Sequence, residues 1–421
     1  MLRTVCAILI GKSIFFLSRA LKLGGGYAAP GLYALKIHPN LVGILSSTIS
    51  KQIIITGTNG KTTTAGMLVH LFRSSGEKVI RNQTGSNLER GIASTLIKHS
   101  SVFGHVKETI AIWEIDEAAF NAIAPKLKPD LVVFLNVFRD QLDRYGEVDS
   151  VVSKWLETIK KMPNNIKYLV NADDGSLEKL LKAGKSVETY SVKGVIIPGE
   201  KPPSKKLNSR FSGAEVNNSS LGGINFRFHL DKCDIPVSLS VPGNYNVYNA
   251  VAALSARFLL GGLADSEAAG LKNFKSSFGR FEKFSIGQTE GYIFLIKNPV
   301  GATQVLQTVT PHINTNGTML FILNDNFADG KDVSWIWDAE FERVKGEGGR
   351  GKTFVSGTRA FDMALRLKYA GLTANQISTN KNISTALNHA IKDISSDEIL
   401  YILPTYTVLL ELQRKGLCKR V

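Results

Sequence analysis

Cysteine is scarce in this sequence. Its 421 residues contain three, Cys6, Cys233 and Cys418, and no two of them form a CxxC pair. The spacing argues against a disulfide framework and against a zinc site built on cysteine thiolates. A chain with so few cysteines suits a reducing compartment, so we expect a cytoplasmic protein.

A long uninterrupted apolar run is also missing. The segment from Leu2 to Leu23 is apolar, but Lys12, Arg19 and Lys22 interrupt it. It is therefore too broken to span a membrane, and no clean cleavage site of a signal peptide precedes the glycines at 24–26. We expect an amphipathic helix that ends at these glycines and packs on the core. Attachment of this helix to a membrane surface is the alternative.

Acidic residues are outnumbered. There are 51 Lys and Arg against 36 Asp and Glu, which gives a formal net charge of +15. This excess favours an anionic partner: nucleic acid, an anionic membrane surface or a phosphorylated substrate. No aromatic-rich basic repeat is present, so we expect no nucleic acid partner. A hydrophobic fraction of 43% indicates a globular chain, and its length indicates two or three domains.

The pattern of the chain is that of an α/β protein. Residues 51–55 read as a buried strand, 56–60 as a glycine-bearing turn and 61–76 as a helix, which is the start of a parallel α/β sheet. Further strands with helices between them are expected at 109–115, 131–137, 168–171, 292–297, 318–323, 352–355 and 399–403. Residues 190–240 have short strands and turn residues instead, which predicts a small β-rich insertion before a helix at 247–260.

The turn carries the sharpest motif, Thr-Gly-Thr-Asn-Gly-Lys-Thr-Thr. It resembles a phosphate-binding loop, in which backbone amides and a helix N-terminus hold phosphate oxygens. Lys61 would neutralise the outer phosphates of ATP, and the Thr62 hydroxyl would bind Mg²⁺. Ile55 replaces the first glycine of the strict pattern, so Gly57 makes the early turn. A glycine-rich turn that binds nothing is the alternative. The expected ATP-binding residues of the loop are Gly57, Thr58, Asn59, Gly60, Lys61, Thr62 and Thr63.

Magnesium needs a further oxygen ligand. Glu114 ends the predicted strand at 109–115, where ligands of doubly wound sheets gather, so it is the first candidate. Asp116 is the second, although it could cap a helix instead. Asp140 and Gln141 follow the next strand and could hold water or metal, or be exposed loop residues.

The loop motif strongly resembles the Mur ligase superfamily, which includes the folylpolyglutamate synthases. Further strings resemble its MurT group, the ligase subunits of lipid II isoglutaminyl synthase; they lie at 87–93, 139–147, 278–282, 297–299, 324–330, 332–335 and 403–407. The resemblance implies a central P-loop domain at 49–288 with a doubly wound, mostly parallel sheet. It also implies a Rossmann-like C-terminal domain at 289–421. The N-terminal helical segment, 1–48, would pack on the central domain.

The resemblance also implies roles for single residues. Asn246 and Asn249 match asparagines that contact adenine, although ordinary helix capping is the alternative. Arg280 would reach ATP from the hinge and Asn298 from the second domain. Lys61 and Glu114 would be catalytic. Many MurT chains carry a four-cysteine zinc ribbon, but region 190–240 contains only Cys233, so no zinc site is expected.

The function implied is amidation of the α-carboxylate of D-glutamate in the lipid II stem peptide, through an acyl phosphate and with ATP and Mg²⁺. Ammonia would come from a GatD-type glutaminase subunit, to which this chain would supply an aspartate. Asp332 is the first candidate, with Asp338 and Asp329 next; helix capping is its alternative role. The enzyme would work in the cytoplasm, at the inner face of the plasma membrane. A folylpolyglutamate synthase-like ligase and a non-catalytic nucleotide-binding scaffold are the competing hypotheses.

Overall fold

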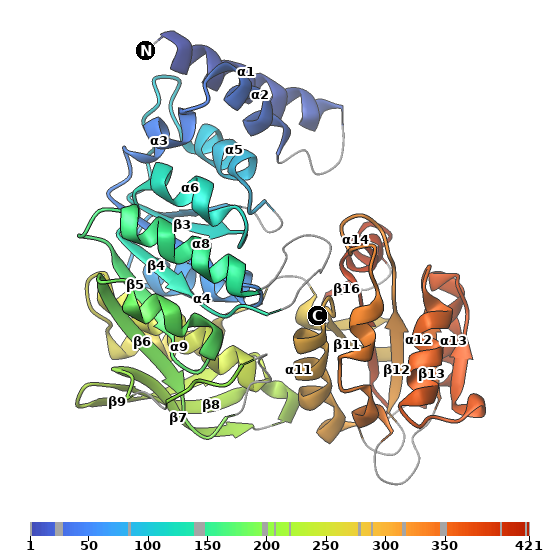
Figure 1. The fold of residues 1–421 in the computed structure, drawn as a ribbon. Helices are drawn as coiled ribbons and strands as arrows, with labels where there is room; N and C mark the ends of the chain where they lie inside the picture. Colours follow the sequence, from blue (N-terminus) through green and yellow to red (C-terminus); the bar gives the residue numbers. More distant parts are fainter. Residues whose placement is uncertain are drawn as a thin grey trace.

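The computed structural model describes most of the chain. The described residues are 2–21, 28–82, 86–138, 148–195, 201–205, 208–218, 220–276, 279–287, 289–313, 317–345, 352–395, 398–416 and 419–420, without the side chains of Arg19, Asn218, Ser220, Arg280, His312, Lys419 and Arg420. The described elements form two sheets with helices on their faces, seen as separate bodies in Figure 1.

The first sheet has nine strands in the order β2-β3-β1-β4-β5-β6-β7-β8-β9. The strands are β1 Lys51–Thr56, β2 Val79–Arg81, β3 Ile110–Ile115, β4 Leu131–Phe134, β5 Lys167–Asn171, β6 Ser186–Val192, β7 Phe211–Asn218, β8 Ile224–Leu230 and β9 Cys233–Leu239. Pairing is parallel from β2 to β7 and antiparallel from β7 to β9. The strands predicted at 190–240 therefore extend the main sheet rather than forming a separate unit, because β6 pairs in parallel with β5.

Helices cover both faces of this sheet. They are α3 Leu41–Ser46, α4 Lys61–Ser74, α5 Glu89–His99, α6 Phe120–Leu127, α8 Val148–Lys161, α9 Asn244–Leu259 and α10 Asp265–Gly270. Strand β1 is apolar at successive positions because both its faces are buried. Ile53 and Ile55 pack on one side with α4 and α9, and Ile54 packs on the other side with α5, α6 and α8.

The second sheet has seven strands in the order β14-β13-β12-β15-β11-β10-β16. They are β10 Arg280–Ile286, β11 Thr289–Phe294, β12 Thr318–Ile322, β13 Thr353–Ser356, β14 Ile377–Thr379, β15 Leu400–Pro404 and β16 Lys419–Arg420. Its helices are α11 Pro299–Val309, α12 Ala360–Tyr369, α13 Ile383–Asp393 and α14 Tyr406–Arg414. The expected α/β class with two mostly parallel sheets is confirmed. The second sheet takes in β10, which the expected boundary at residue 288 left with the first.

Short 3₁₀ helices complete the described elements. They are η1 Gly175–Lys182, η2 Ser220–Gly222, η3 Leu271–Asn273, η4 Thr310–His312, η5 Ser334–Trp337, η6 Phe341–Val344 and η7 Ala374–Gln376.

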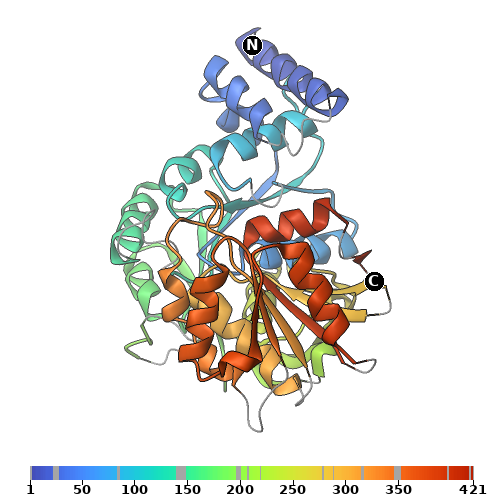
Figure 2. The ribbon, with the colours of Figure 1, turned by 90° about the vertical axis from the view of Figure 1, so that its right-hand side faces the viewer.

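Two further helices, α1 Leu2–Ala20 and α2 Ala29–Ile37, lie at one end of the molecule. In Figure 2 they are the dark blue pair beyond the first sheet. Ala7, Ile8 and Ala34 belong to the same apolar core as α5, so these helices are packed on the first body. Among the described helices, none is long and apolar enough to cross a membrane.

Candidate nucleotide site

The loop between β1 and α4 depends on two glycines in the left-handed region. Gly57 has a φ of 135° and Gly60 a φ of 88°. A Cβ atom at Gly57 would lie 2.7 Å from the carbonyl oxygen of Asn136, and one at Gly60 would lie 2.2 Å from Asn249 Oδ1. Both positions therefore require glycine, because a side chain would be strained at these φ values and would also collide with the neighbouring oxygen atom.

Asn136, at the end of β4, holds this loop from the side. Thr58 N–H donates to the Asn136 carbonyl at 2.9 Å, and Asn59 N–H donates to Asn136 Oδ1 at 2.8 Å. Asn136 Nδ2 returns a bond to the Asn59 carbonyl at 3.1 Å. The amides of Thr58 and Asn59 are thus used inside the protein. The phosphate-binding donors that remain are the first amides of α4, which have no acceptor within the helix and no side-chain cap at Gly60.

Lys61 begins α4, and its ammonium group lies over the loop. Nζ forms an ion pair with Glu117 Oε2 at 3.0 Å and donates to the carbonyl oxygens of Gly57 and Thr58. Both side chains of the ion pair are nearly buried. Glu117 was not predicted as a site residue. Its position shortly after a buried strand was the available signal, but Glu114 and Asp116 share that signal.

Thr62 and Glu114 lie together as expected for a shared metal. The Thr62 hydroxyl donates to Glu114 Oε2 at 2.7 Å. Asn82 fixes the backbone of Glu114 on both sides, accepting from its N–H and donating to its carbonyl, each at 2.8 Å. The second carboxylate oxygen, Glu114 Oε1, is buried without a hydrogen-bond partner. A buried carboxylate oxygen without a partner is costly, so the site fits a hard cation that would bind there.

The other predicted metal ligands have different outcomes. Asp116 accepts from the backbone N–H of Ala118 at 3.1 Å and from Asn87 Nδ2 at 3.5 Å, so it stabilises the turn that precedes α6. It does not cap that helix, because the N-cap of α6 is Ala119. Asp140 and Gln141 lie outside the described residues. Within the described part of the chain, no three His, Cys, Asp or Glu side chains form a metal-binding group. Magnesium usually keeps several water ligands and binds one or two protein carboxylates beside the phosphates of a nucleotide.

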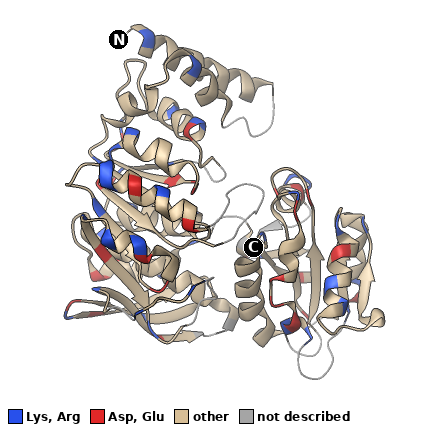
Figure 3. Cartoon of the chain, in the orientation of Figure 1, with Lys and Arg blue, Asp and Glu red and all other residues tan. Residues whose placement is uncertain are grey.

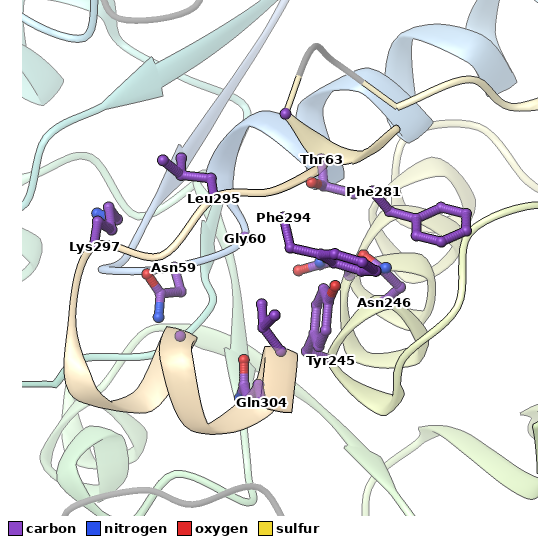
Figure 4. Close-up of a pocket in the computed structure, with 14 residues that line it drawn as sticks. Asn59, Gly60, Thr63, Tyr245, Asn246, Phe281, Phe294, Leu295, Lys297 and Gln304 are labelled. Carbon is purple, nitrogen blue, oxygen red and sulfur yellow. The ribbon is translucent and has the colours of Figure 1, made fainter. Parts of the chain in front are cut away.

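A pocket opens between the two bodies beside this loop. It is lined by Asn59, Gly60, Thr63, Tyr245, Asn246, Asn249, Gly279, Phe281, Phe294, Leu295, Lys297, Gly301, Gln304 and Val305. Figure 4 shows Tyr245, Phe281 and Phe294 on one side, with Thr63 near Phe281, and Asn59 and Lys297 on the other side. Phe281 stacks on Tyr292 with ring centroids 5.1 Å apart. An aromatic wall suits the flat face of a nucleobase.

Asn246 and Asn249, the two predicted adenine contacts, line this pocket. Their side-chain amides already form hydrogen bonds within the protein. Asn249 Oδ1 accepts from the Thr64 hydroxyl at 3.2 Å, and its Nδ2 donates to Asn246 Oδ1 at 3.2 Å. Asn246 Nδ2 donates to the Pro242 carbonyl at 2.7 Å. Sequence reasoning missed the aromatic residues, since their contributions come from α9, β10 and β11 and no local pattern connects these elements.

The second body reaches the loop through one amide pair. Asn59 Nδ2 donates to Asn298 Oδ1 at 3.2 Å, and Asn298 Nδ2 donates to Asn59 Oδ1 at 3.1 Å. Asn298 also caps α11, because its Oδ1 accepts from the N–H of Gly301 at 2.8 Å. Arg280 begins β10, but its side chain lies outside the described atoms. The structure thus brings Lys61, Thr62, Glu114, Asn246, Asn249 and Asn298 to one site.

Known proteins share both bodies. The Mur ligase middle domain family matches residues 55–257, and the MurT ligase C-terminal family matches residues 295–409. The MurT subunit of lipid II isoglutaminyl synthase (glutamine-hydrolyzing) from Streptococcus pneumoniae R6 is 31% identical, over 98% of this chain and 96% of that protein. The chain belongs to the MurT family of Mur ligases.

Solved structures agree with the MurT assignment at the level of the fold. MurF from Acinetobacter baumannii has a TM-score of 0.72 at 20% identity, covering 92% of this chain and 80% of the other. Folylpolyglutamate synthase from Mycobacterium tuberculosis, solved with ADP and AMPPCP, has a TM-score of 0.65 at 16% identity. It covers 89% of this chain and 94% of the other.

The three candidate aspartates of the MurT C-terminal body differ in their surroundings. Asp329 is buried, and both its oxygens accept from Thr407, one from the N–H at 2.7 Å and one from the hydroxyl. Burial raises the pKa of Asp329 despite these bonds. Asp332 is half-buried and accepts from Ser334 N–H at 2.8 Å, which lowers its pKa. Asp338 is exposed just after η5. Asp332 therefore accepts a hydrogen bond from the first residue of η5, while the N-cap position of this helix is Val333.

Proposed function

We propose that the chain is the ligase subunit of a lipid II isoglutaminyl synthase. It would activate the α-carboxylate of D-glutamate in the stem peptide as an acyl phosphate and amidate it. One observation carries this proposal: Glu114 presents a buried oxygen without a partner beside the Thr62 hydroxyl, at the N-terminus of a helix that begins with Lys61. The relative from S. pneumoniae is named as the MurT subunit of lipid II isoglutaminyl synthase (glutamine-hydrolyzing), which supports this proposal.

The site has a place for each part of MgATP. The first amides of α4 and the Lys61 ammonium would hold the phosphates, and the aromatic side of the pocket would hold the base. The folylpolyglutamate synthase of the same fold was solved with ADP and AMPPCP, which supports a nucleotide here. Thr62 and Glu114 would hold Mg²⁺, and that ion would supply charge stabilisation for the transferring phosphoryl group.

The chain needs no side-chain nucleophile for this reaction. The carboxylate oxygen of the substrate attacks the γ-phosphorus, ADP leaves, and an acyl phosphate forms. Ammonia then attacks the acyl carbon, phosphate leaves, and a proton is lost from the nitrogen to give the amide. Lys61 would bind the charge that develops on the phosphoryl oxygens. The Asn59–Asn298 pair would hold the second body over the loop and limit the access of water to the acyl phosphate.

Ammonia would come from a GatD-type glutaminase bound to the C-terminal body. Asp332 accepts from the N–H of Ser334, the first residue of η5, and this short helix carries Trp337, which is 47% exposed. Trp337 makes an edge contact with Tyr369 of α12, with ring centroids 5.5 Å apart, and Tyr369 is 71% exposed. Exposed aromatic residues are enriched at protein interfaces, so this surface next to Asp332 supports a bound partner. Asp332 would serve the glutaminase in this interface.

Residues 1–48 would form an N-terminal helical segment, 49–288 a central ATP-binding domain and 289–421 a C-terminal domain. The strand pairing of β10 supports moving the second boundary to about residue 280. The enzyme would act in the cytoplasm, at the inner face of the plasma membrane where lipid II is presented.

Reconstitution tests the proposal. The chain is mixed with its glutaminase, ATP, Mg²⁺, glutamine and lipid II, and amidated lipid II and released phosphate are measured. We expect one phosphate per amide formed, and amidation without the glutaminase when ammonium chloride is added. Addition of glutamate rather than ammonia to the substrate would favour a folylpolyglutamate synthase-like ligase. ATP binding without phosphate release in any mixture would favour a non-catalytic scaffold.

A further inference from the structure

Helix α1 is apolar on both of its sides, although only one side is packed. Ala7 and Ile8 lie in the core shared with α5 and are fully buried. On the outward side, Leu2, Leu9 and Phe16 recur every seven residues and are 80%, 47% and 72% exposed. Seven residues are close to two helical turns, so these three side chains form one stripe. Ile10, Leu17 and Leu21, beside the stripe, are also exposed.

An apolar stripe of this kind is unusual on a surface helix. Surface helices carry polar residues on the side that faces water, and helices apolar all round are normally covered. Single exposed apolar residues need no explanation, but a contiguous set along five turns marks an interaction surface. Among the described residues, no part of the chain covers the stripe or its apolar neighbours, since these six side chains are 42% to 80% exposed.

The charge of this region is one-sided. The first acidic residue of the chain is Glu77, so the 76 residues before it carry no carboxylate side chain. Residues 1–50 contain five cations, Arg3, Lys12, Arg19, Lys22 and Lys36. Figure 3 shows blue without red along α1 and α2, whereas the helices below them carry both colours. At 100° per residue, Lys12 falls on one border of the stripe and Arg3 on the other. Lys12 Nζ donates to the Ser100 carbonyl at 2.7 Å and Arg3 Nε to the Ile37 carbonyl at 2.6 Å, so each cation is held at the edge of the packed side and keeps its other N–H donors for headgroups.

We propose that this outward face of α1 binds the anionic surface of a lipid bilayer. A helix whose apolar stripe is bordered by cations lies in the interface, with the apolar side chains among the acyl chains and the cations at the headgroups. No described helix is able to span a bilayer, so α1 would lie on the membrane and not cross it. Its place at one end of the molecule leaves it open to a flat surface (Figures 1 and 2).

Charge favours a bilayer over a second copy of the chain as the occupant. Pairing two copies along the stripe would bring two acid-free, cationic segments together, and like charges at close range repel. An anionic headgroup layer neutralises the same cations, at about 1 kcal/mol for each Lys or Arg near the surface.

This inference deepens the membrane-surface part of the proposed function and rests on it for the choice of a bilayer. It does not depend on the ATP chemistry, because the stripe is on α1 and not at the nucleotide loop. Binding to vesicles and binding of ATP are therefore separate measurements on the same full-length chain, and either can fail without the other.

The test is flotation of the full-length chain with vesicles of phosphatidylcholine alone or with about 30% phosphatidylglycerol. The test variant replaces Leu9 and Phe16 by serine, L9S and F16S together. The matched control is Phe361→Ser, since Phe361 is 63% exposed on α12 in the other body. We expect binding to the anionic vesicles only, weakened about tenfold or more in the double variant, unchanged in the control, and reduced by high salt.

Three outcomes would overturn the inference. The first is no binding of the natural chain to anionic vesicles. The second is vesicle binding that the double variant leaves unchanged while its thermal midpoint and ATP affinity stay those of the natural chain. The third is a dimer in sedimentation velocity without lipid that the double variant dissociates, because a second copy would then cover the stripe.

Discussion

Two loops of this molecule follow buried parallel strands and end at helices, yet they differ in where a carboxylate is left available for a ligand. The loop after β1 leads to Lys61 and lies against the unpartnered oxygen of Glu114. The loop after β12 satisfies Asp329 completely within the chain and leaves Asp332 and Trp337 toward solvent. In the first loop, the group that can still bind a ligand is the buried Glu114 oxygen. In the second loop, the groups that can still bind a partner, Asp332 and Trp337, lie at the surface.

This difference indicates what each loop is built to meet. A buried oxygen without a partner destabilises the free chain and is relieved only by something small enough to enter, such as a metal ion. A half-exposed carboxylate costs little in water, and the exposed aromatic rings beside it gain from a large partner that excludes water from them and supplies a hydrogen-bond donor for the carboxylate. The first loop therefore suits a nucleotide and its cation, and the second suits a protein.

Replacing Lys61 should have the largest effect, because it removes the cation of the nucleotide loop. In Lys61→Ala, we expect ATP-dependent amidation to fall by about 10³-fold or more, because the phosphoryl charge loses its nearest cation. Calorimetry with ATP and the phosphate-release rate measure the loss. Lys107→Ala, an exposed lysine remote from the loop, is the control and should change neither quantity. Normal ATP binding and turnover in Lys61→Ala would remove the nucleotide site from this loop.

Glu114→Gln should separate function from stability. We expect amidation to fall about 10²- to 10³-fold and to require more Mg²⁺, since a neutral amide is a poor ligand for this ion. Stability of the free chain should stay the same or rise, because the buried oxygen without a partner no longer carries charge. Magnesium titrations of activity and thermal melting are the measurements. Glu117→Gln, which removes the partner of Lys61, should leave the magnesium requirement unchanged. Equal magnesium shifts in both variants would count against Glu114 as the ligand.

Asp332→Asn should impair the use of glutamine at the second loop without changing the nucleotide chemistry at the first. We expect glutamine-dependent amidation to fall by about 10²-fold, by analogy with other catalytic triads whose aspartate is replaced. Amidation with added ammonium chloride should be unchanged, because the nucleotide site is intact. Asp338→Asn discriminates between Asp332 and Asp338 and should leave glutamine use intact. A parallel loss with glutamine and with ammonium in Asp332→Asn would mean that this residue only supports the fold of the loop.

Sequence patterns predicted the strands well and the site only in part. Lys61, Thr62 and Glu114 were accessible because a strand, a glycine turn and a helix place them by local rules. Three other features could not be predicted, because each depends on elements far apart in sequence. They are the hydrogen bonds from Asn136 to the loop, the ion pair of Lys61 with Glu117 and the aromatic wall of the pocket. The extension of the first sheet by β6 to β9 was missed for the same reason: short strands signal their existence but not their neighbours.

The smallest effect, and the finest test of the comparison, is the pH dependence of two aspartates in one loop. The pKa of Asp329 is raised above its ordinary 3.8, so the stability it contributes is present below 3.8 and is lost as pH rises through the raised value. The pKa of Asp332 is lowered, so its contribution is present above 3.8 and is lost as pH falls through the lowered value. From pH about 3 to about 7, the free energy of unfolding of the natural chain should therefore decrease relative to Asp329→Asn and increase relative to Asp332→Asn. Urea unfolding followed by tryptophan fluorescence, to which Trp335 and Trp337 contribute together with Trp113 and Trp155, measures both differences. Slopes of the same sign would contradict the contrast between a satisfied interior acid and an available surface acid.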